Sequence, residues 1–138
     1  LWVPTESDVM YGYLPYSDIP YPTFFSGWNF STDQKHGGSY SLRLIPGGSY
    51  SINYGCDAGS KTITIYAYAP AYGTLLIEVR DPDSGELMGS DATASTEAWE
   101  QLSVTFTAEK KVYVVNLIHA GCSEFHGGEH LGYFDDLV

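Results

Sequence analysis

The chain has 138 residues, of which 43% are hydrophobic and 15% aromatic, and its formal net charge at pH 7 is −11. This length and hydrophobic content predict a single globular domain with its own core and exclude a disordered chain. Phosphate backbones and anionic lipids repel so acidic a chain, so we expect neither nucleic acid nor a membrane surface as a partner. No apolar run approaches the roughly 20 residues of a membrane-spanning helix, so membrane insertion is not expected either.

Residues 1–23 differ from the rest of the chain because tyrosine and proline alternate between positions 11 and 22. Proline lacks the backbone N–H that a central strand needs, so this stretch predicts an extended arm lying across a surface. That surface belongs either to the same domain or to a neighbouring copy. The opening residues 1–4 have neither a basic start nor an apolar core, so we expect a segment that is mature or cut from a longer chain.

From residue 24 onward, short runs of alternating apolar and polar residues are separated by turn residues. The period of two predicts strands, and the residues at 46–48 and 81–85 have the chemistry of turns. The predicted strands are 40–44, 50–54, 61–69, 74–81, 86–90, 99–107, 111–120 and 131–138, with a polar loop at 91–98. The run 111–120 is the most apolar, and we expect it to be buried on both sides. Short strands without a helical period predict an all-β, antiparallel β-sandwich over residues 24–138.

Two cysteines, Cys56 and Cys122, each follow a predicted strand and adjoin a glycine. A disulfide between them would stabilise the fold by roughly 4 kcal/mol by constraining the unfolded chain, and two free buried thiols are the alternative. Asn29 begins a glycosylation sequon, Asn29-Phe30-Ser31. Together with the low lysine content, these features favour an extracellular or cell-surface location.

The closing stretch contains two adjacent acids, Asp135 and Asp136, in an otherwise aromatic and aliphatic strand. Buried carboxylates are costly unless they are paired. A bound cation or a set of backbone N–H donors would provide the partner.

Four features then follow one another in a particular order, namely Gly27-Trp28, the run from His36 to Leu44, Trp99, and the closing run from Tyr133 to Val138. In this order they resemble the jelly-roll carbohydrate-binding modules with a galactose-binding-like fold, over about residues 24–138. The resemblance implies a jelly-roll β-sandwich, a Trp99 that packs in the core, and carbohydrate as the ligand.

The same resemblance implies a structural calcium ion held by the side chains of Asp135 and Asp33 and by backbone carbonyls near residues 35–37. This family often has a glutamate ligand where the present chain has Phe25, so that carboxylate is missing. The alternative is that Asp135 and Asp136 accept backbone N–H groups from a neighbouring loop.

The chain contains 12 tyrosines and 3 tryptophans, more than a core of this size requires, and sugar rings stack on aromatic faces. Tyr66 and Tyr68 lie on the polar side of their predicted strand, so we expect them to form a carbohydrate-binding platform. Tyr50, Tyr54 and Tyr113 are expected to join it from adjacent strands. The alternative is that the N-terminal arm covers these tyrosines.

Catalysis is not expected, because no serine or cysteine has a recognisable nucleophile setting and acid pairs such as Asp81 and Asp83 lie in turns. The loop at 126–130 holds two histidines and a glutamate, which would suit a transition metal or stay a solvated loop.

Two hypotheses follow. The first is a non-catalytic module of a secreted or cell-surface protein that binds carbohydrate through exposed tyrosines. The second is a self-assembling structural subunit of a surface layer, filament or virion, in which the N-terminal arm docks on an identical subunit.

Overall fold

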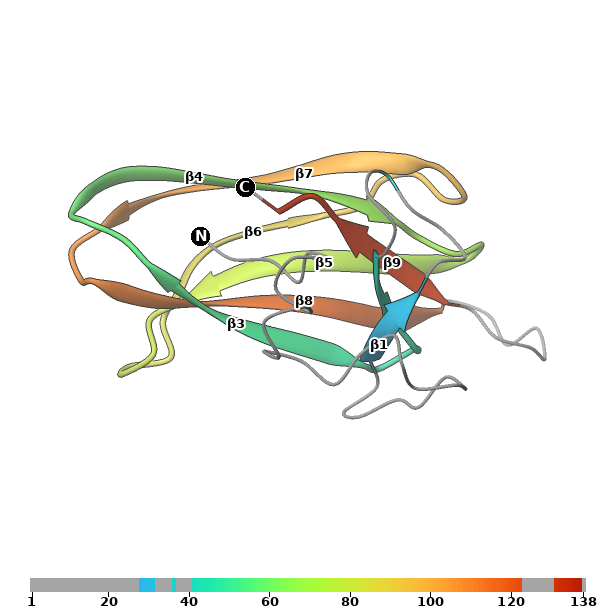
Figure 1. The fold of residues 1–138 in the computed structure, drawn as a ribbon, viewed down its shortest axis with the longest axis horizontal. Coiled ribbons are helices and arrows are strands. Elements are labelled where there is room, and N and C mark those ends of the chain that lie inside the picture. Colours follow the sequence, from blue (N-terminus) through green and yellow to red (C-terminus); the bar gives the residue numbers. More distant parts are fainter. Residues whose placement is uncertain (1–27, 32–35, 37–40, 123–130, 138) are drawn as a thin grey trace.

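The computed structural model describes residues 28–31, 36, 41–122 and 131–137 (Figure 1). The predicted arm at 1–23, the predicted ligand Asp33 and the histidine loop at 126–130 lie outside the described residues. The strands in the described part are β1 (Trp28–Ser31), β2 (Ser41–Leu44), β3 (Ser49–Gly55), β4 (Gly59–Tyr68), β5 (Gly73–Arg80), β6 (Leu87–Ala92), β7 (Trp99–Ala108), β8 (Val112–Cys122) and β9 (Gly132–Asp135).

These strands form two antiparallel sheets packed face to face (Figure 1). The five-stranded sheet has the order β1-β2-β9-β4-β7, and the four-stranded sheet has the order β3-β8-β5-β6. The chain changes sheet at almost every connection, as in a jelly roll. The predicted all-β sandwich is therefore confirmed.

The core lies between the two sheets and is built by alternation along the long strands. On β4, Ile63 and Ile65 point inward and are fully buried, and on β7 Leu102 and Val104 do the same. Burying each such side chain stabilises the fold by about 1.5–3 kcal/mol. The expectation for the run 111–120 was wrong in one respect, because only alternate residues of β8 are fully buried and Val114 is half-buried. Each sheet of this sandwich has one face on the core and one outer face.

Gly132 determines how closely β9 packs against the opposite sheet. A Cβ atom added to Gly132 would lie 2.4 Å from Cδ2 and 3.1 Å from Cγ of Leu75, a fully buried residue of β5. Only a residue without a side chain fits this approach. Gly132 thus lets β9, the middle strand of the five-stranded sheet and the one that carries Tyr133 and Asp135, pack closely against β5.

The predicted disulfide is wrong. The N–H of Cys56 donates to the carbonyl of Lys111 at the start of β8 (2.9 Å), and Cys56 is a free thiol. Cys122 ends β8, where its backbone pairs with Gly73. Ten residues of extended strand separate these two ends by roughly 33 Å. A disulfide needs Cα atoms within about 7 Å of each other.

Candidate functional site

The outer face of the five-stranded sheet carries an aromatic pair, Tyr68 and Trp99. The two residues are register partners on β4 and β7, and both are half-buried. Their ring centroids lie 5.5 Å apart at an interplanar angle of 62°. Behind Tyr68, the ring of Tyr133 on β9 makes an edge contact at 6.2 Å. The aromatic pair therefore forms an angled surface that Tyr133 supports from one side.

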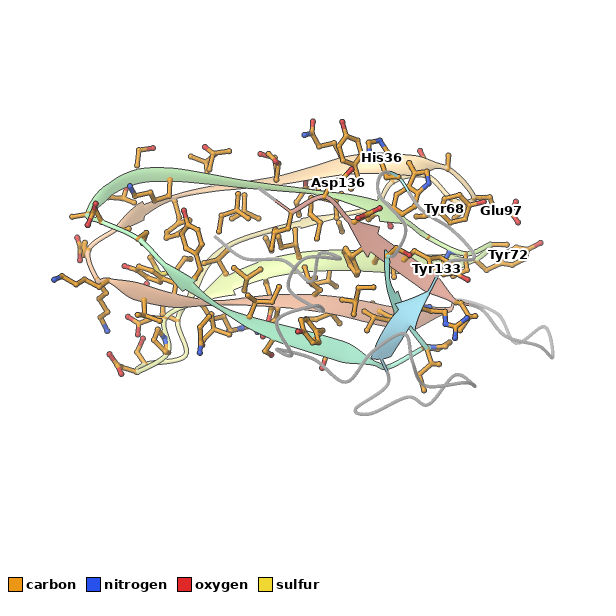
Figure 2. The ribbon with its side chains drawn as sticks, viewed as in Figure 1. His36, Tyr68, Tyr72, Glu97, Tyr133 and Asp136 are labelled. Carbon is orange, nitrogen blue, oxygen red and sulfur yellow. The ribbon has the colours of Figure 1, made fainter. Side chains whose placement is uncertain are left out.

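Tyr66 is the next outward residue on β4, and the imidazole of His36 lies flat on its ring. The two ring centroids are 3.7 Å apart with an interplanar angle of 12°. The same imidazole makes an edge contact with Trp99 at 5.6 Å. His36, which is labelled in Figure 2, thus contacts residues of both β4 and β7, although it comes from a segment that precedes β2 in the chain.

Asp135 and Asp136 hold His36 in this position. The backbone N–H of His36 donates to Oδ2 of Asp135 at 2.9 Å, and Nδ1 of His36 lies 2.6 Å from Oδ2 of Asp136. The other oxygen of Asp135 accepts the N–H of Asp136 at 2.8 Å. Asp135 is only 7% exposed, so these backbone donors stabilise a buried carboxylate.

This arrangement matches part of the alternative to calcium that the sequence left open, because Asp135 accepts the N–H of His36 whereas Asp136 contacts the His36 imidazole. Both carboxylate oxygens of Asp135 accept a backbone N–H. The described part of the chain contains no group of three or more His, Cys, Asp and Glu side chains suited to a metal ion. Asp33 lies outside the described residues, so calcium binding stays a prediction.

Three of the five predicted platform tyrosines do not lie on this face. Tyr50 is 8% exposed and Tyr113 is 2% exposed, and both belong to the core. Tyr54 packs partly buried against the same core, and burial raises the pKa of its hydroxyl. The hydroxyl of Tyr113 accepts the N–H groups of Glu109 and Lys110 at 2.8 Å and 3.1 Å. The prediction that Tyr50, Tyr54 and Tyr113 join Tyr66 and Tyr68 in one exposed platform was therefore wrong.

Trp99 was expected in the core, and this expectation was also wrong. The inward positions of β7 are Leu102, Val104 and Phe106, so Trp99 falls in the opposite phase with the exposed Gln101. The parity of β7 could have revealed this, since Trp99 shares its face with polar residues. Tyr66 and Tyr68 do lie on the outer face of their strand, but that they bind carbohydrate is a proposal made below.

The loops at the end of this face are fixed by hydrogen bonds. The N–H of Glu97 donates to the carbonyl of Ala69, next to Tyr68, at 2.7 Å. The carboxylate of Glu100 accepts the N–H groups of Ala94 and Ser95 at 3.0 Å each. Glu97 itself has a φ of 56°, a strained conformation that the surrounding contacts maintain. Tyr68 and Trp99 therefore lie at the ends of β4 and β7 where a hydrogen bond joins the two adjoining loops.

Beyond Tyr66, the outer face of β4 and β7 carries hydroxyl groups. Thr62 and Thr105 are register partners whose Oγ1 atoms lie 2.9 Å apart. The hydroxyl ladder consists of Ser60, Thr62 and Thr64 on β4 and Ser103, Thr105 and Thr107 on β7. From Tyr68 to Ser60 this part of the face extends over roughly 26 Å.

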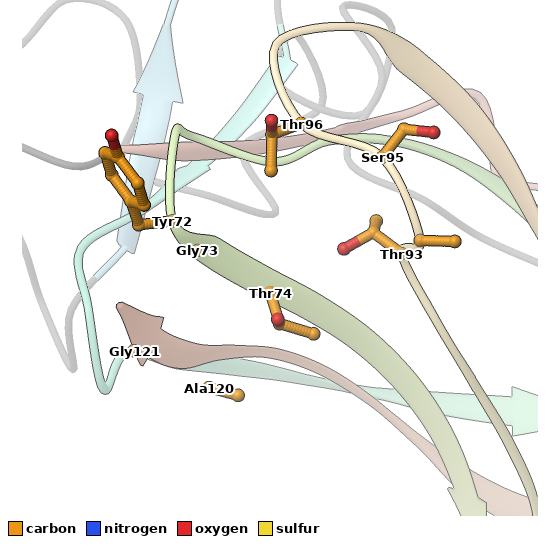
Figure 3. A pocket seen from close by; sticks show the side chains of 9 residues that line it. Tyr72, Gly73, Thr74, Thr93, Ser95, Thr96, Ala120 and Gly121 are labelled. Atoms are coloured by element: carbon orange, nitrogen blue, oxygen red, sulfur yellow. The ribbon is translucent and has the colours of Figure 1, made fainter. Parts of the chain in front are cut away.

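A separate hollow of about 440 Å³ lies at the end of the sandwich, between the loops that follow β4 and β6 (Figure 3). Tyr72 stands at its edge with 51% of its surface exposed and a φ of 62°. Hydroxyl-bearing side chains line it, among them Thr74, Ser95 and Thr96, and none of the lining residues is charged. The hollow is a second place on the described surface where a neutral polar ligand would fit.

The sequence matches no protein-family model and no curated protein. Solved structures with a similar fold include carbohydrate-binding modules, some of them attached to enzymes. One is TmCBM61, solved in complex with β-1,4-galactotriose, with a TM-score of 0.57, 17% identity, and coverage of 82% of this chain and 87% of that chain. Another is the CBM22-1 xylan-binding domain from Paenibacillus barcinonensis Xyn10C, with a TM-score of 0.56, 16% identity, and coverage of 80% and 77%.

A β-1,3-glucan-binding CBM6 from Bacillus halodurans is similar with a TM-score of 0.50 and 21% identity, over 80% of this chain and 85% of that one. At these identities the comparisons show a shared fold. The resemblance expected from the order of motifs is thereby confirmed at the level of the fold.

In the described part of the chain, no helix has the length and hydropathy that a membrane crossing requires.

Proposed function

We propose that this domain is a non-catalytic module that binds a neutral saccharide on the outer face of its five-stranded sheet. The observation that carries the proposal is the aromatic pair Tyr68 and Trp99, half-exposed on a face that is otherwise polar and rich in hydroxyl groups. The aliphatic C–H faces of a sugar ring stack on such rings, and neighbouring polar groups fix its orientation.

The charges on the site favour a neutral ligand. Asp136 is exposed beside the aromatic pair, and the whole chain carries a net charge of −11. An anionic saccharide would be repelled by this field, whereas an uncharged one is not. A secreted or cell-surface location is the setting in which such a module would meet polysaccharide.

The absence of catalysis is part of the same proposal. Hydrolysis of a glycosidic bond requires two carboxyl groups on opposite sides of the bond, about 5–9.5 Å apart. Among the described acids near the aromatic pair, Asp135 and Asp136 instead hold His36, and Glu100 caps a loop. Several of the solved structures with a similar fold are binding modules without a catalytic domain, which supports this part of the proposal.

The assembling-subunit hypothesis depends on the arm at 1–23, which lies outside the described residues, so it stays a prediction. Deleting residues 1–22 abolishes assembly if the arm docks on a neighbour and leaves a monomer of unchanged affinity if the domain is a binding module. Light scattering at several concentrations distinguishes the two results.

The test of the binding proposal is a glycan array of neutral saccharides followed by calorimetry on two matched variants. Tyr68→Ala removes one ring of the aromatic pair, and Tyr72→Ala removes an exposed tyrosine at the hollow. If the sheet face is the site, Tyr68→Ala abolishes binding while Tyr72→Ala leaves the affinity unchanged. The opposite result would assign binding to the hollow, and an array without any bound glycan would refute the proposal.

A structural calcium ion at Asp135 is proposed as an accessory to this scaffold. Its test needs no saccharide. Chelator should lower the melting temperature of the wild type, and Asp135→Ala should remove that sensitivity. A melting curve that is the same in chelator and in added calcium counts against the ion.

A further inference from the structure

We propose that His36 divides the outer face of the five-stranded sheet and limits the saccharide site to the aromatic pair. This inference rests on the proposed function, which it makes more specific. It predicts that the wild-type domain binds a short saccharide or the end of a chain, and that His36 determines this length.

The first reason is position. Tyr66 lies between the aromatic pair and the hydroxyl ladder, since the outward residues of β4 run from Tyr68 through Tyr66 to Thr64. The ring of His36 occupies the stacking position on Tyr66 at 3.7 Å and 12°. A sugar ring stacked on that face of Tyr66 would need the space that the imidazole fills. A chain running along β4 from the aromatic pair to the ladder therefore meets His36.

The second reason is the way His36 is held. Its backbone N–H is bound by the buried carboxylate of Asp135, and its Nδ1 lies 2.6 Å from Asp136. Asp136 has a φ of 52°, a conformation that costs free energy in a residue other than glycine. Strain of this kind persists where the surrounding contacts require it. Two hydrogen bonds and two ring contacts thus fix one imidazole on one tyrosine.

The third reason is the shape of the uncovered part. Tyr68 and Trp99 meet at 62°, so their rings do not form a flat strip for a long chain. An angled pair fits one or two sugar rings held from two sides. Tyr133, which is 7% exposed, adds support behind Tyr68 but little open surface.

The test is a length series. Affinities of the wild type and of His36→Ala would be measured by calorimetry for β-1,4-linked galacto- and xylo-oligosaccharides from the disaccharide to the hexasaccharide. We expect the wild-type affinity to stop rising after two sugar units. The affinity of His36→Ala should continue to rise with the length of the oligosaccharide, until it is about tenfold higher than that of the wild type for the hexasaccharide. His36→Phe, which keeps a ring over Tyr66, should restore the wild-type plateau.

A second measurement is independent of any saccharide. Nitration of Tyr66 by tetranitromethane, followed by peptide mass spectrometry, should be several-fold faster in His36→Ala than in the wild type and His36→Phe. Tyr72 is nitrated at the same rate in all three proteins and is the internal reference. Equal nitration of Tyr66 in all three would overturn the inference.

The binding results separate the remaining possibilities. If His36→Ala loses affinity for every length, His36 is itself a saccharide contact and the inference is overturned. If wild type and His36→Ala show the same dependence on length, it is overturned as well. If neither protein binds these oligosaccharides or any glycan of the array, the proposed function fails, while nitration still decides whether His36 covers Tyr66.

Discussion

The two outer faces of the sandwich differ in how their polar groups are used. On the four-stranded sheet, Ser51 donates to Oδ1 of Asn116 at 2.6 Å, and the amide of Asn116 donates to Glu78 at 3.1 Å. Arg80 completes the row through Nε, 2.8 Å from Glu78, and this pair lowers the pKa of the Glu78 carboxyl. These side chains bind one another across three strands.

On the five-stranded sheet, the corresponding outer positions near the strand ends hold aromatic rings. Tyr68 and Trp99 contact each other only at an angle, and about them lie exposed polar residues such as Gln101. A face whose polar groups bind one another has little to gain from a ligand, because a ligand would have to replace those bonds. The contrast explains why the outer face of the five-stranded sheet is the better candidate site. Four predictions test it.

The largest expected effect is on binding. Trp99→Ala removes the larger ring of the aromatic pair, and buried or half-buried aromatic residues of this kind contribute 2 kcal/mol or more to binding. We expect about a hundredfold loss of saccharide affinity by calorimetry. The control is Asn116→Ala on the opposite face, which should bind as the wild type does. Equal affinities for all three proteins would remove the distinction between the faces.

The second effect is on stability and follows from Gly132. Gly132→Ala drives a methyl group into Leu75, and overpacking of this kind costs about 1–3 kcal/mol. Urea unfolding should show the loss. Gly55→Ala is the matched control, since the nearest atom to its Cβ is a carbonyl oxygen 3.9 Å away. If the two variants unfold at the same urea concentration, β9 does not depend on close approach to β5.

The third effect concerns the polar row of the four-stranded sheet. Asn116→Ala breaks two side-chain hydrogen bonds, so we expect a loss of about 1 kcal/mol in the free energy of unfolding. Ser51→Ala removes one of the two and should cost less. A larger cost for Ser51→Ala than for Asn116→Ala would show that the row is not held by these bonds.

The smallest effect is a dependence on pH at the end of the sandwich away from the aromatic pair. Hydrogen bonds from Lys110, and from backbone N–H groups in its own turn, hold the pKa of Asp81 below its usual range. A lowered folded-state pKa contributes stability above the unfolded value of about 4, and this contribution is lost as the pH falls through the folded value.

Asp81→Asn should therefore flatten the fall in melting temperature between about pH 5 and pH 2. Asp57→Asn, at an exposed aspartate, keeps the wild-type profile. Saccharide binding at neutral pH is unchanged in both variants, because neither residue adjoins the aromatic pair. An Asp81→Asn profile parallel to the wild type would contradict the role of Lys110.

Much of the fold followed from local pattern. The alternation of Ile63 and Ile65 with Tyr66 and Tyr68 separated an inner face from an outer one, and the structure has that alternation. The same parity rule places Tyr50 and Tyr54 with Ile52, on the inner face. The predicted exposure of Tyr50 and Tyr54 was wrong because it followed from the abundance of tyrosine, which says nothing about the phase of a residue in its strand. Trp99 is the converse case, since its phase indicates the outer face.

What the sequence indicated by itself is what depends on neighbours along the chain, namely most of the strands, their turns and the phase of the residues within each strand. Only the tertiary structure decided which strands lie side by side. The contact of His36 with Asp135 joins residues 99 positions apart, and the separation of Cys56 from Cys122 depends on the two ends of β8. The physical reason is that a period of two fixes a side chain relative to its own strand, whereas strand order depends on how the whole core packs.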